Sequence, residues 1–304
     1  MPVPPVGPVG TMLTAMVTPF TADGALDVDG VQRLAAHLVD GLGNDGLVVN
    51  GTTGEAPTTT DEEKARVIAA TVEAVGDRAR VIAGVGTYDT AHSVHLAREA
   101  EGSGAHGLLV VSPYYNRPPQ EGLLQHFRTV ADATGLPVIT YDIPKRTGVA
   151  IEVDTLVRLA EHPRIVANKD AKGDLDAAQW AMARCDLGWY SGDDILNLPL
   201  LSVGANGFIS VVGHLVADRI RDMARAFHGG DVCSAIGINR TLLPVYAGCF
   251  RTQGAILTKA ALALQGWPAG PVRLPLVNAT DEQIAQLRVD LAAGAVPGFQ
   301  AGAS

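Results

Sequence analysis

The side chain whose placement most strongly suggests chemistry is Lys169, one of five lysines in the chain. It alone falls inside an apolar segment, Ile165–Ala171, that is expected to form a buried strand. Burial of an ammonium group is costly, so desolvation lowers the pKa of a lysine. Because a neutral amine attacks carbonyl carbons, we predict that Lys169 forms a Schiff base with an oxo-acid. A structural ion pair is the alternative, but the adjacent Asp170 points to the opposite face of a strand.

Other polar side chains follow apolar segments in the same way. Thr52 and Thr53 come after Gly46–Gly51, between two glycines, where hydroxyls and backbone N–H groups can bind an anion. A plain turn is the better explanation when this motif is taken alone. Tyr114 and Tyr115 follow another segment, where packing is the more frequent role, although a phenol can also relay protons.

A further segment contributes a phenol and a guanidinium. Tyr141 lies two residues before Ile143 and shares its side of the strand. If that side faces the interior of a barrel, Tyr141 lies near Lys169. Arg146 follows in the loop and has a planar fork that suits a carboxylate, although a surface salt bridge would explain it if it stood alone. Asp194, after a later segment, is expected to cap a helix.

The elements that must position these residues alternate regularly along the chain. Short, nearly continuous apolar segments are typical of parallel strands that are covered on both faces. There are eight of them: Leu13–Phe20, Gly46–Gly51, Arg80–Gly86, Gly107–Pro113, Pro137–Pro144, Ile165–Ala171, Leu187–Asp193 and Gly207–Gly213. Segments with helical periodicity lie between them: Val28–Leu42, Asp61–Val75, Gln120–Thr134, Asp154–Glu161, Asp174–Arg184, Ile195–Val203 and Leu215–Phe227. This repetition, without a GxGxxG motif, favours a closed (β/α)8 TIM barrel over an open sheet, with catalysis at the C-terminal ends of the strands.

Three regions are expected along the chain. Residues 1–10, rich in Pro and Gly, are expected to be a disordered leader, and residues 11–229 to form the barrel. Residues 230–304 are expected to form a helical extension without strands. Its helices are predicted at Val232–Cys249, Ala255–Gln265 and Asp281–Ala293.

Composition excludes several classes of protein. The formal net charge of −9 argues against a nucleic-acid or anionic-membrane partner, since both need clustered Lys and Arg. No apolar run approaches the roughly 20 residues that cross a bilayer. The three cysteines form no CxxC, and the histidines have no metal-ligand spacing. We therefore expect reduced thiols, no metal site and a cytoplasmic location.

Taken together, the motifs at the ends of the predicted strands resemble those of the dihydrodipicolinate synthase family. This family is part of the N-acetylneuraminate lyase superfamily of Schiff-base enzymes. The likeness extends from Leu13 into the helical extension. Five motifs occur in the family's order: Gly51-Thr52-Thr53-Gly54-Glu55, Pro113-Tyr114-Tyr115-Asn116, Tyr141-Asp142-Ile143-Pro144 with Arg146-Thr147-Gly148, Lys169-Asp170-Ala171, and Ser191-Gly192-Asp193-Asp194.

The resemblance implies a reaction. Pyruvate would condense with L-aspartate 4-semialdehyde to give 4-hydroxy-tetrahydrodipicolinate, on the route to diaminopimelate and lysine, without a metal or an organic cofactor. Lys169 would form the imine with pyruvate, and Tyr141 would act as general acid and base. Thr52 or Thr53 and Tyr115 would complete a proton relay to solvent.

The resemblance also implies substrate contacts and an assembly. Thr53, Gly192 and Ile209 would line the pyruvate pocket, and Arg146 would hold the carboxylate of the semialdehyde. In this family the relay tyrosine, here Tyr115, reaches in from the adjacent subunit. A homotetramer built as a dimer of dimers is therefore expected.

Two alternatives remain open. One is a pyruvate-dependent aldolase or lyase of sialic or 2-keto-3-deoxy sugar acids, and the other is a barrel without catalytic activity. Arg146 and the Thr52-Thr53 pair favour the synthase over the lyase. The presence of Tyr141, Lys169 and the Thr52-Thr53 pair together argues against a non-catalytic barrel.

The chain departs from the family pattern at a few positions. Lys145 replaces a common Gly or Ser and adds a second cation beside Arg146. Asn168 replaces a β-branched apolar residue, and a buried Asn needs hydrogen-bond partners. Asp61 and Tyr88 stand where lysine-inhibited relatives often carry His and Asn, so we expect feedback inhibition by lysine to be weak or absent.

Overall fold

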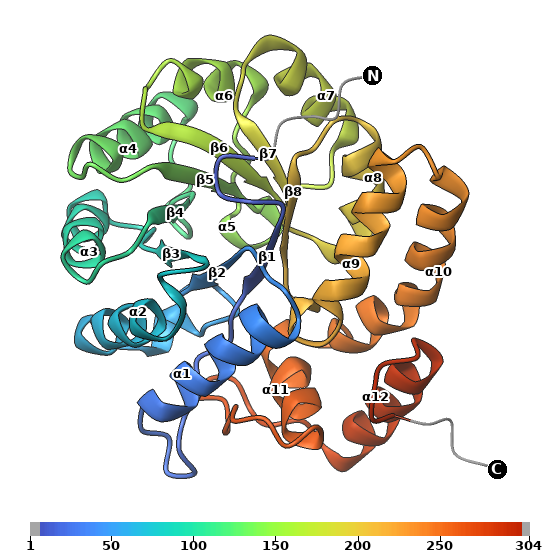
Figure 1. The fold of residues 1–304 in the computed structure, drawn as a ribbon. Helices are drawn as coiled ribbons and strands as arrows, with labels where there is room; N and C mark the ends of the chain where they lie inside the picture. Colours follow the sequence, from blue (N-terminus) through green and yellow to red (C-terminus); the bar gives the residue numbers. More distant parts are fainter. Residues whose placement is uncertain (1–6, 300–304) are drawn as a thin grey trace.

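Eight parallel strands form a closed barrel that is surrounded by helices (Figure 1). The structure, a computed structural model, describes residues 7–299. The strands are β1 (Met12–Ala15), β2 (Gly46–Val49), β3 (Arg80–Gly84), β4 (Gly107–Val111), β5 (Val138–Asp142), β6 (Ile165–Asp170), β7 (Gly188–Ser191) and β8 (Gly207–Ser210). Each pairs with the next, and β8 pairs with β1, which closes the sheet. The prediction of a TIM barrel is confirmed. Seven of the eight strands lie within their predicted segments, and β1 begins at Met12, one residue before its segment.

The helices around the barrel follow the strands in alternation. They are α1 (Val28–Ala36) with the π-helix η1 (His37–Gly41), the 3-10 helix η2 (Ala56–Thr58), α2 (Asp61–Val75), α3 (Thr90–Gly102), α4 (Gln120–Asp132), α5 (Pro144–Thr147), α6 (Val153–Ala160), α7 (Leu175–Arg184), the 3-10 helix η3 (Asp194–Leu196), α8 (Asn197–Ser202) and α9 (Gly213–His228). The bounds of α2 match the prediction because Thr60 and Glu63 form a capping box at its start.

Two apolar clusters hold the barrel together. The larger lies between the strands and the helices, and the smaller fills the interior of the barrel. The interior cluster consists of Val9, Leu13, Ala15, Val48, Ile82, Leu109, Ile139, Tyr141, Ala167, Ala171, Tyr190 and Ile209. A filled interior gives the strand ends a rigid base, as is usual for this fold.

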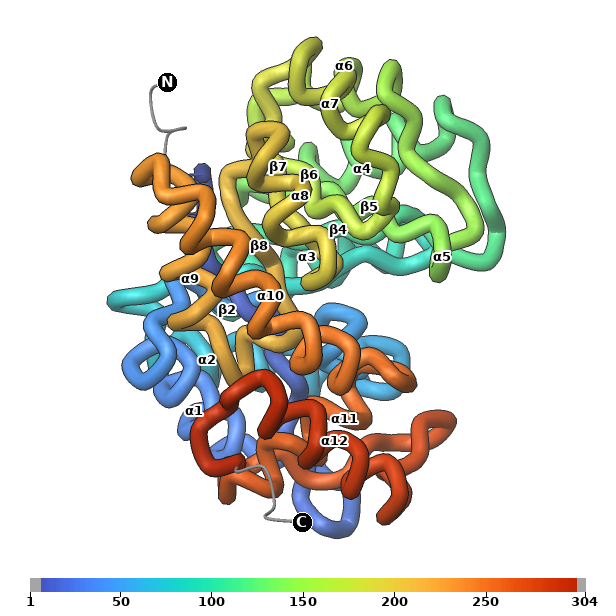
Figure 2. Tube along the Cα trace, turned by 90° about the vertical axis from the view of Figure 1, so that its right-hand side faces the viewer, coloured from blue at the N-terminus to red at the C-terminus, as the bar shows by residue number. Residues whose placement is uncertain are grey.

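The C-terminal part of the chain is helical. It comprises α10 (Val232–Cys249), α11 (Gly254–Leu264) and α12 (Asp281–Ala293). Figures 1 and 2 show α10 beside α9, and α11 and α12 near one another at the end of the molecule where α1 lies. The loop after α11 reaches back to the barrel, since the N–H of Phe20 donates to the carbonyl of Ala269 (3.2 Å).

The described start of the chain lies against the N-terminal end of the barrel. Residues 1–6 of the predicted leader lie outside the described residues. Val9 is buried in the interior cluster, and its N–H donates to the hydroxyl of Tyr190 (3.3 Å), which donates to the carbonyl of Gly10 (2.9 Å). Among residues 7–299, no helix is both long and apolar enough to span a membrane.

Candidate active site

A cavity of about 380 Å³ opens at the C-terminal ends of the strands. It brings together residues from five strand ends and from the start of α11. The lining residues are Thr52, Thr53, Tyr141, Ile143, Lys145, Arg146, Lys169, Ala171, Gly192, Asp193, Val211, Phe250, Gln253, Gly254 and Ala255. Most of the predicted site residues therefore share one cavity, as expected for a barrel of this type.

Lys169 lies at the base of this cavity. It stands opposite Tyr141 in the register of β5 and β6, and its Nζ lies 4.3 Å from the centre of the Tyr141 ring. Only 4% of the residue is exposed. Burial lowers the pKa of Lys169 from its ordinary 10.5 to about 8; the Asp194 carboxylate raises it, and the Arg146 guanidinium lowers it further. About a tenth of the amine is thus neutral at pH 7.

Asp170 does not pair with Lys169. Its carboxylate accepts hydrogen bonds from Nε1 of Trp189 (3.2 Å) and the backbone N–H of Lys172 (2.9 Å), on the other face of β6. Within residues 7–299, no carboxylate lies close enough to Lys169 to form an ion pair, so the structural ion pair is excluded for that part of the chain. Asn168 also faces away from the cavity, and its Oδ1 accepts from the hydroxyl of Thr140 (2.8 Å).

Tyr141 carries a phenol that is kept protonated. Desolvation raises its pKa to about 12, and the Arg146 guanidinium and a hydrogen bond with Thr52 act in the opposite direction. A neutral phenol beside an amine and a hydroxyl can give a proton and take it back. Tyr141 and Thr52 also line a second cavity, of about 220 Å³, that adjoins the first.

Thr52 and Thr53 lie in a turn that follows β2, which we call the threonine turn (residues 50–55). The residues at its two ends, Asn50 and Glu55, both have φ of +56°, in the left-handed region that glycine favours. The hydroxyl of Thr18 donates to the carbonyl of Gly54 at 2.7 Å. A Cβ on Gly54 would lie 3.2 Å from the oxygens and nitrogen around it, so the turn is tightly packed.

The end of β7 fits closely against the lysine. A Cβ on Gly192 would lie 2.8 Å from Cε of Lys169, so a glycine is needed there. Ile209 belongs to the interior cluster and is fully buried, whereas Val211, two residues further along the chain, lines the cavity.

The prediction that Asp194 caps a helix is wrong. Its buried carboxylate instead accepts hydrogen bonds from the N–H groups of Val211 (2.9 Å) and Val212 (3.1 Å) and from the Ser210 hydroxyl. Asn197 donates to the same carboxylate at 3.1 Å. Asp194 therefore ties the end of β7 to the end of β8. Burial raises the pKa of its carboxyl, and these hydrogen bonds oppose that shift. Spacing could not reveal this role, because the partners come from a different strand end.

The rim of the cavity carries two cations. Lys145 and Arg146 are exposed and lie in the single-turn helix α5, which begins at Pro144 and ends with a left-handed Gly148 (φ +76°). Arg146 lines both cavities. An exposed guanidinium above a lysine-lined cavity is well suited to draw in and hold a carboxylate.

Tyr115 lies apart from the cavity in this single chain. The residue is 94% exposed and has φ of +74°, although it is not a glycine. Tyr114 is half-buried and packs edge-on against Tyr88 (ring centres 5.5 Å apart). The side chain predicted as a relay thus lines neither of the two cavities that contain Tyr141 of its own chain.

Sequence reasoning missed the contribution of the helical extension. Phe250, Gln253 and Gly254, at the junction of α10 and α11, line the cavity together with Thr52 and Thr53. Nothing in their types or spacing marks them, since they follow the barrel in the sequence. In residues 7–299, no group of three His, Cys, Asp or Glu side chains is placed to hold a metal ion.

Comparison with known proteins agrees with this geometry. The profile of the Dihydrodipicolinate synthetase family matches residues 8–294. The 4-hydroxy-tetrahydrodipicolinate synthase 2 of Streptomyces coelicolor is 68% identical over 96% of this chain and 97% of its own length. A crystal structure of the Cyanidioschyzon merolae enzyme with lysine bound is 39% identical, with a TM-score of 0.92 over 94% of this chain and 98% of that chain. The chloride-inhibited Acinetobacter baumannii enzyme complexed with pyruvate is 34% identical, with a TM-score of 0.90 over 94% of this chain and 99% of that chain. The chain belongs to the dihydrodipicolinate synthetase family.

Proposed function

We propose that the chain is a 4-hydroxy-tetrahydrodipicolinate synthase, a lyase that condenses pyruvate with L-aspartate 4-semialdehyde in diaminopimelate and lysine biosynthesis. The observation that carries this proposal is the position of Lys169. Its amine lies 4.3 Å from the ring centre of Tyr141 at the base of a cavity rimmed by Arg146. Relatives with the synthase name, among them one that is 68% identical over 96% of this chain, support the choice of reaction.

The first half of the reaction joins pyruvate to the enzyme. The neutral amine of Lys169 adds to the C2 carbonyl carbon, and water leaves as the protonated imine forms. The imine withdraws electrons, so the methyl carbon loses a proton and becomes an enamine carbon. Tyr141 supplies and removes protons through the hydroxyl of Thr52, and Gly192 and Thr53 leave room for the small oxo-acid. This sequence uses only protein groups and substrate, which is why we propose no metal or organic cofactor.

The second half forms the carbon–carbon bond. The enamine carbon attacks the aldehyde carbon of the semialdehyde, and the aldehyde oxygen takes up a proton. The amino group of the semialdehyde portion then attacks the imine carbon and releases Lys169 as a free amine, which closes the ring. Arg146 holds the carboxylate of the semialdehyde, and Lys145 beside it adds attraction at the rim.

We also propose that Tyr115 acts in a neighbouring subunit. The residue is 94% exposed, and its backbone is held in the left-handed region. Both features suit a side chain that enters the cavity of an adjacent subunit and not the cavity of its own chain. A symmetric dimer would exchange these tyrosines, and two dimers would form the proposed homotetramer in the cytoplasm. Analytical ultracentrifugation tests the assembly. Mixing a Tyr115→Phe chain with a Lys169→Ala chain tests the exchange, because only hybrid dimers would then contain one complete site.

The Schiff base is tested by trapping. Wild-type protein incubated with pyruvate and borohydride is expected to gain the mass of one reduced pyruvate adduct per chain, and Lys169→Ala is expected to gain none. An absent wild-type adduct, or an adduct that survives Lys169→Ala, would refute the proposal. Turnover of aspartate semialdehyde, compared with sialic and 2-keto-3-deoxy sugar acids, then separates the synthase from a sugar-acid lyase.

A further inference from the structure

The C-terminal end of the threonine turn is attached to the helical extension. Glu55 closes the turn with φ of +56°, a conformation that a residue with a side chain rarely adopts. Such a conformation persists only where the surroundings hold it in place. The Glu55 side chain is almost completely buried, so its carboxylate requires partners inside the protein.

Those partners come from the far end of the sequence. The Lys259 Nζ, on α11, lies 2.6 Å from Oε1 of Glu55, and only 3% and 1% of the two side chains are exposed. The backbone N–H of Arg273 donates to the other carboxylate oxygen at 2.8 Å. One oxygen of Glu55 is therefore paired with Lys259 and the other is hydrogen-bonded to Arg273, so the extension fixes the direction of the side chain.

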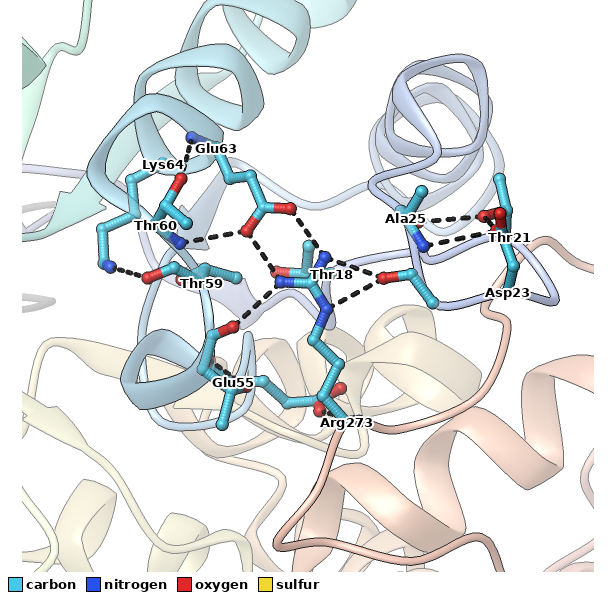
Figure 3. Close-up of polar contacts among 12 residues, drawn as sticks. Thr18, Thr21, Asp23, Ala25, Glu55, Thr59, Thr60, Glu63, Lys64 and Arg273 are labelled. Carbon is cyan, nitrogen blue, oxygen red and sulfur yellow. Dashed lines mark hydrogen bonds and ion pairs between the residues drawn. The ribbon is translucent and has the colours of Figure 1, made fainter.

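The anchoring groups are themselves fixed. Lys259 also donates to the carbonyl of Pro271 (2.8 Å) and lies over the ring of Phe20 (4.2 Å). Figure 3 shows Arg273 between Glu55 and Glu63, and its guanidinium makes two hydrogen bonds to Glu63, of 2.7 and 2.6 Å. The same guanidinium donates to backbone carbonyls on either side of the cluster, at Gly24 and Thr58. A rigid cluster thus faces the threonine turn.

The helix that carries the anchor also forms a wall of the cavity. Gly254 and Ala255, in the first turn of α11, line the cavity together with Thr52 and Thr53. Lys259 lies about one turn further along the same helix. The cavity wall and the anchor of the threonine turn are consequently parts of one rigid element.

We infer that Glu55 and Lys259 are positioning residues, whose buried ion pair holds the hydroxyls of Thr52 and Thr53 in register with Tyr141 for proton transfer. This inference rests on the proposed function. Neither residue lines the cavity, so the pair acts through the turn rather than on the substrate. A catalytic hydroxyl displaced by about 1 Å can cost about 100-fold in rate.

The test separates imine formation from proton transfer. Glu55→Gln keeps the shape of the side chain and removes its charge. We expect this variant to give the wild-type yield of borohydride-trapped pyruvate adduct at equilibrium. Two rates are expected to fall about 10- to 100-fold. One is the exchange of the pyruvate methyl hydrogens with D2O, measured by NMR, and the other is kcat. The KM for pyruvate should stay nearly unchanged. Exchange within twofold of wild type would overturn the inference.

A double variant keeps the test decisive if the single one does not fold. Removing one partner leaves a buried charge alone, whereas Glu55→Gln with Lys259→Met removes both charges and is expected to recover the stability. Exchange that stays at least about fivefold slow in this folded double variant supports a positioning role. Exchange that returns to wild type together with the Tm means that the pair only stabilises the fold.

A matched control comes from the extension itself. Asp290 is largely buried and pairs with Arg251 through two hydrogen bonds, of 2.7 and 2.8 Å, without contacting the threonine turn. Asp290→Asn is expected to lower the Tm and leave exchange unchanged. Equal slowing in this control would assign the loss to general destabilisation and overturn the inference. A wild-type protein that forms no adduct would instead refute the proposed function, so the two failures are distinguishable.

Discussion

Removal of the Asp194 carboxylate and removal of the Arg146 guanidinium should shift the pH midpoint of imine formation at Lys169 in opposite directions. The pKa of Lys169 is about 8 rather than 10.5, so the neutral fraction at pH 7 is about a tenth, roughly 300-fold more than for an unperturbed lysine. This difference corresponds to about 3 kcal/mol between the two protonation states. The Asp194 carboxylate favours the ammonium form, and the Arg146 guanidinium opposes it. Asp194→Asn should therefore lower the pKa of Lys169, and Arg146→Ala should raise it.

The assay is the second-order rate constant for adduct formation at subsaturating pyruvate, measured by rapid borohydride quench and intact mass between pH 6 and 10. Wild-type protein should show a single rise with a midpoint near pH 8, the pKa of Lys169. The midpoint should lie lower in Asp194→Asn and higher in Arg146→Ala, whatever happens to the plateau rate. A wild-type midpoint near 10, or two variants that move the same way, would refute this electrostatic reasoning.

Four further predictions concern Lys169, its two neighbours Tyr141 and Gly192, and inhibition by lysine. Lys169→Met should raise the free energy of unfolding below pH 8 by up to about 3 kcal/mol, because the folded pKa of about 8 lies below the unfolded 10.5. This gain should shrink as the pH rises from 8 to 10.5, and a less stable variant in urea denaturation at pH 7 would contradict it. Tyr141→Phe should lower kcat about 100- to 10,000-fold without unfolding the chain, and near-normal turnover would exclude an acid/base role. Gly192→Ala should slow imine trapping at least about tenfold, since its Cβ would lie 2.8 Å from Cε of Lys169; an unchanged trapping rate would show that the lysine has room to move. Free lysine should inhibit weakly or not at all, because Asp61 and Tyr88 stand where lysine-inhibited relatives often carry His and Asn; half-inhibition below 1 mM lysine would be inconsistent with this.

The barrel was predictable because its signals are local. Each strand is a short apolar run, and α2 begins where Thr60 and Glu63 form a capping box. Helix α3 was not assigned, because its buried face consists mainly of small side chains such as Ala97 and Ala100, which give weak periodicity. The alternation of strands and helices still determined the fold without it.

The candidate site was predictable where a residue type carries its own chemistry. A lysine inside an apolar strand and a tyrosine on the neighbouring strand are unusual enough to be recognised. The role of Asp194 was not, because its partners, Val211 and Val212, belong to another strand end. The contacts that hold Glu55 could not be predicted either, because Arg273 lies 218 residues away in the sequence. Contacts that only the closed barrel and its extension create leave no periodic signal.

The contact between the start of the chain and Tyr190 covers the N-terminal end of the barrel. Val9 and the phenol of Tyr190 stop one end, and packed side chains fill the interior up to Lys169. Substrates therefore reach Lys169 from the C-terminal face of the barrel. Under the proposed mechanism, pyruvate has to reach Lys169 before the larger semialdehyde fills the part of the cavity near Arg146, and the water that imine formation releases has to leave by the same face. The depth at which Lys169 lies in the cavity thus favours a fixed order of substrate binding and water release.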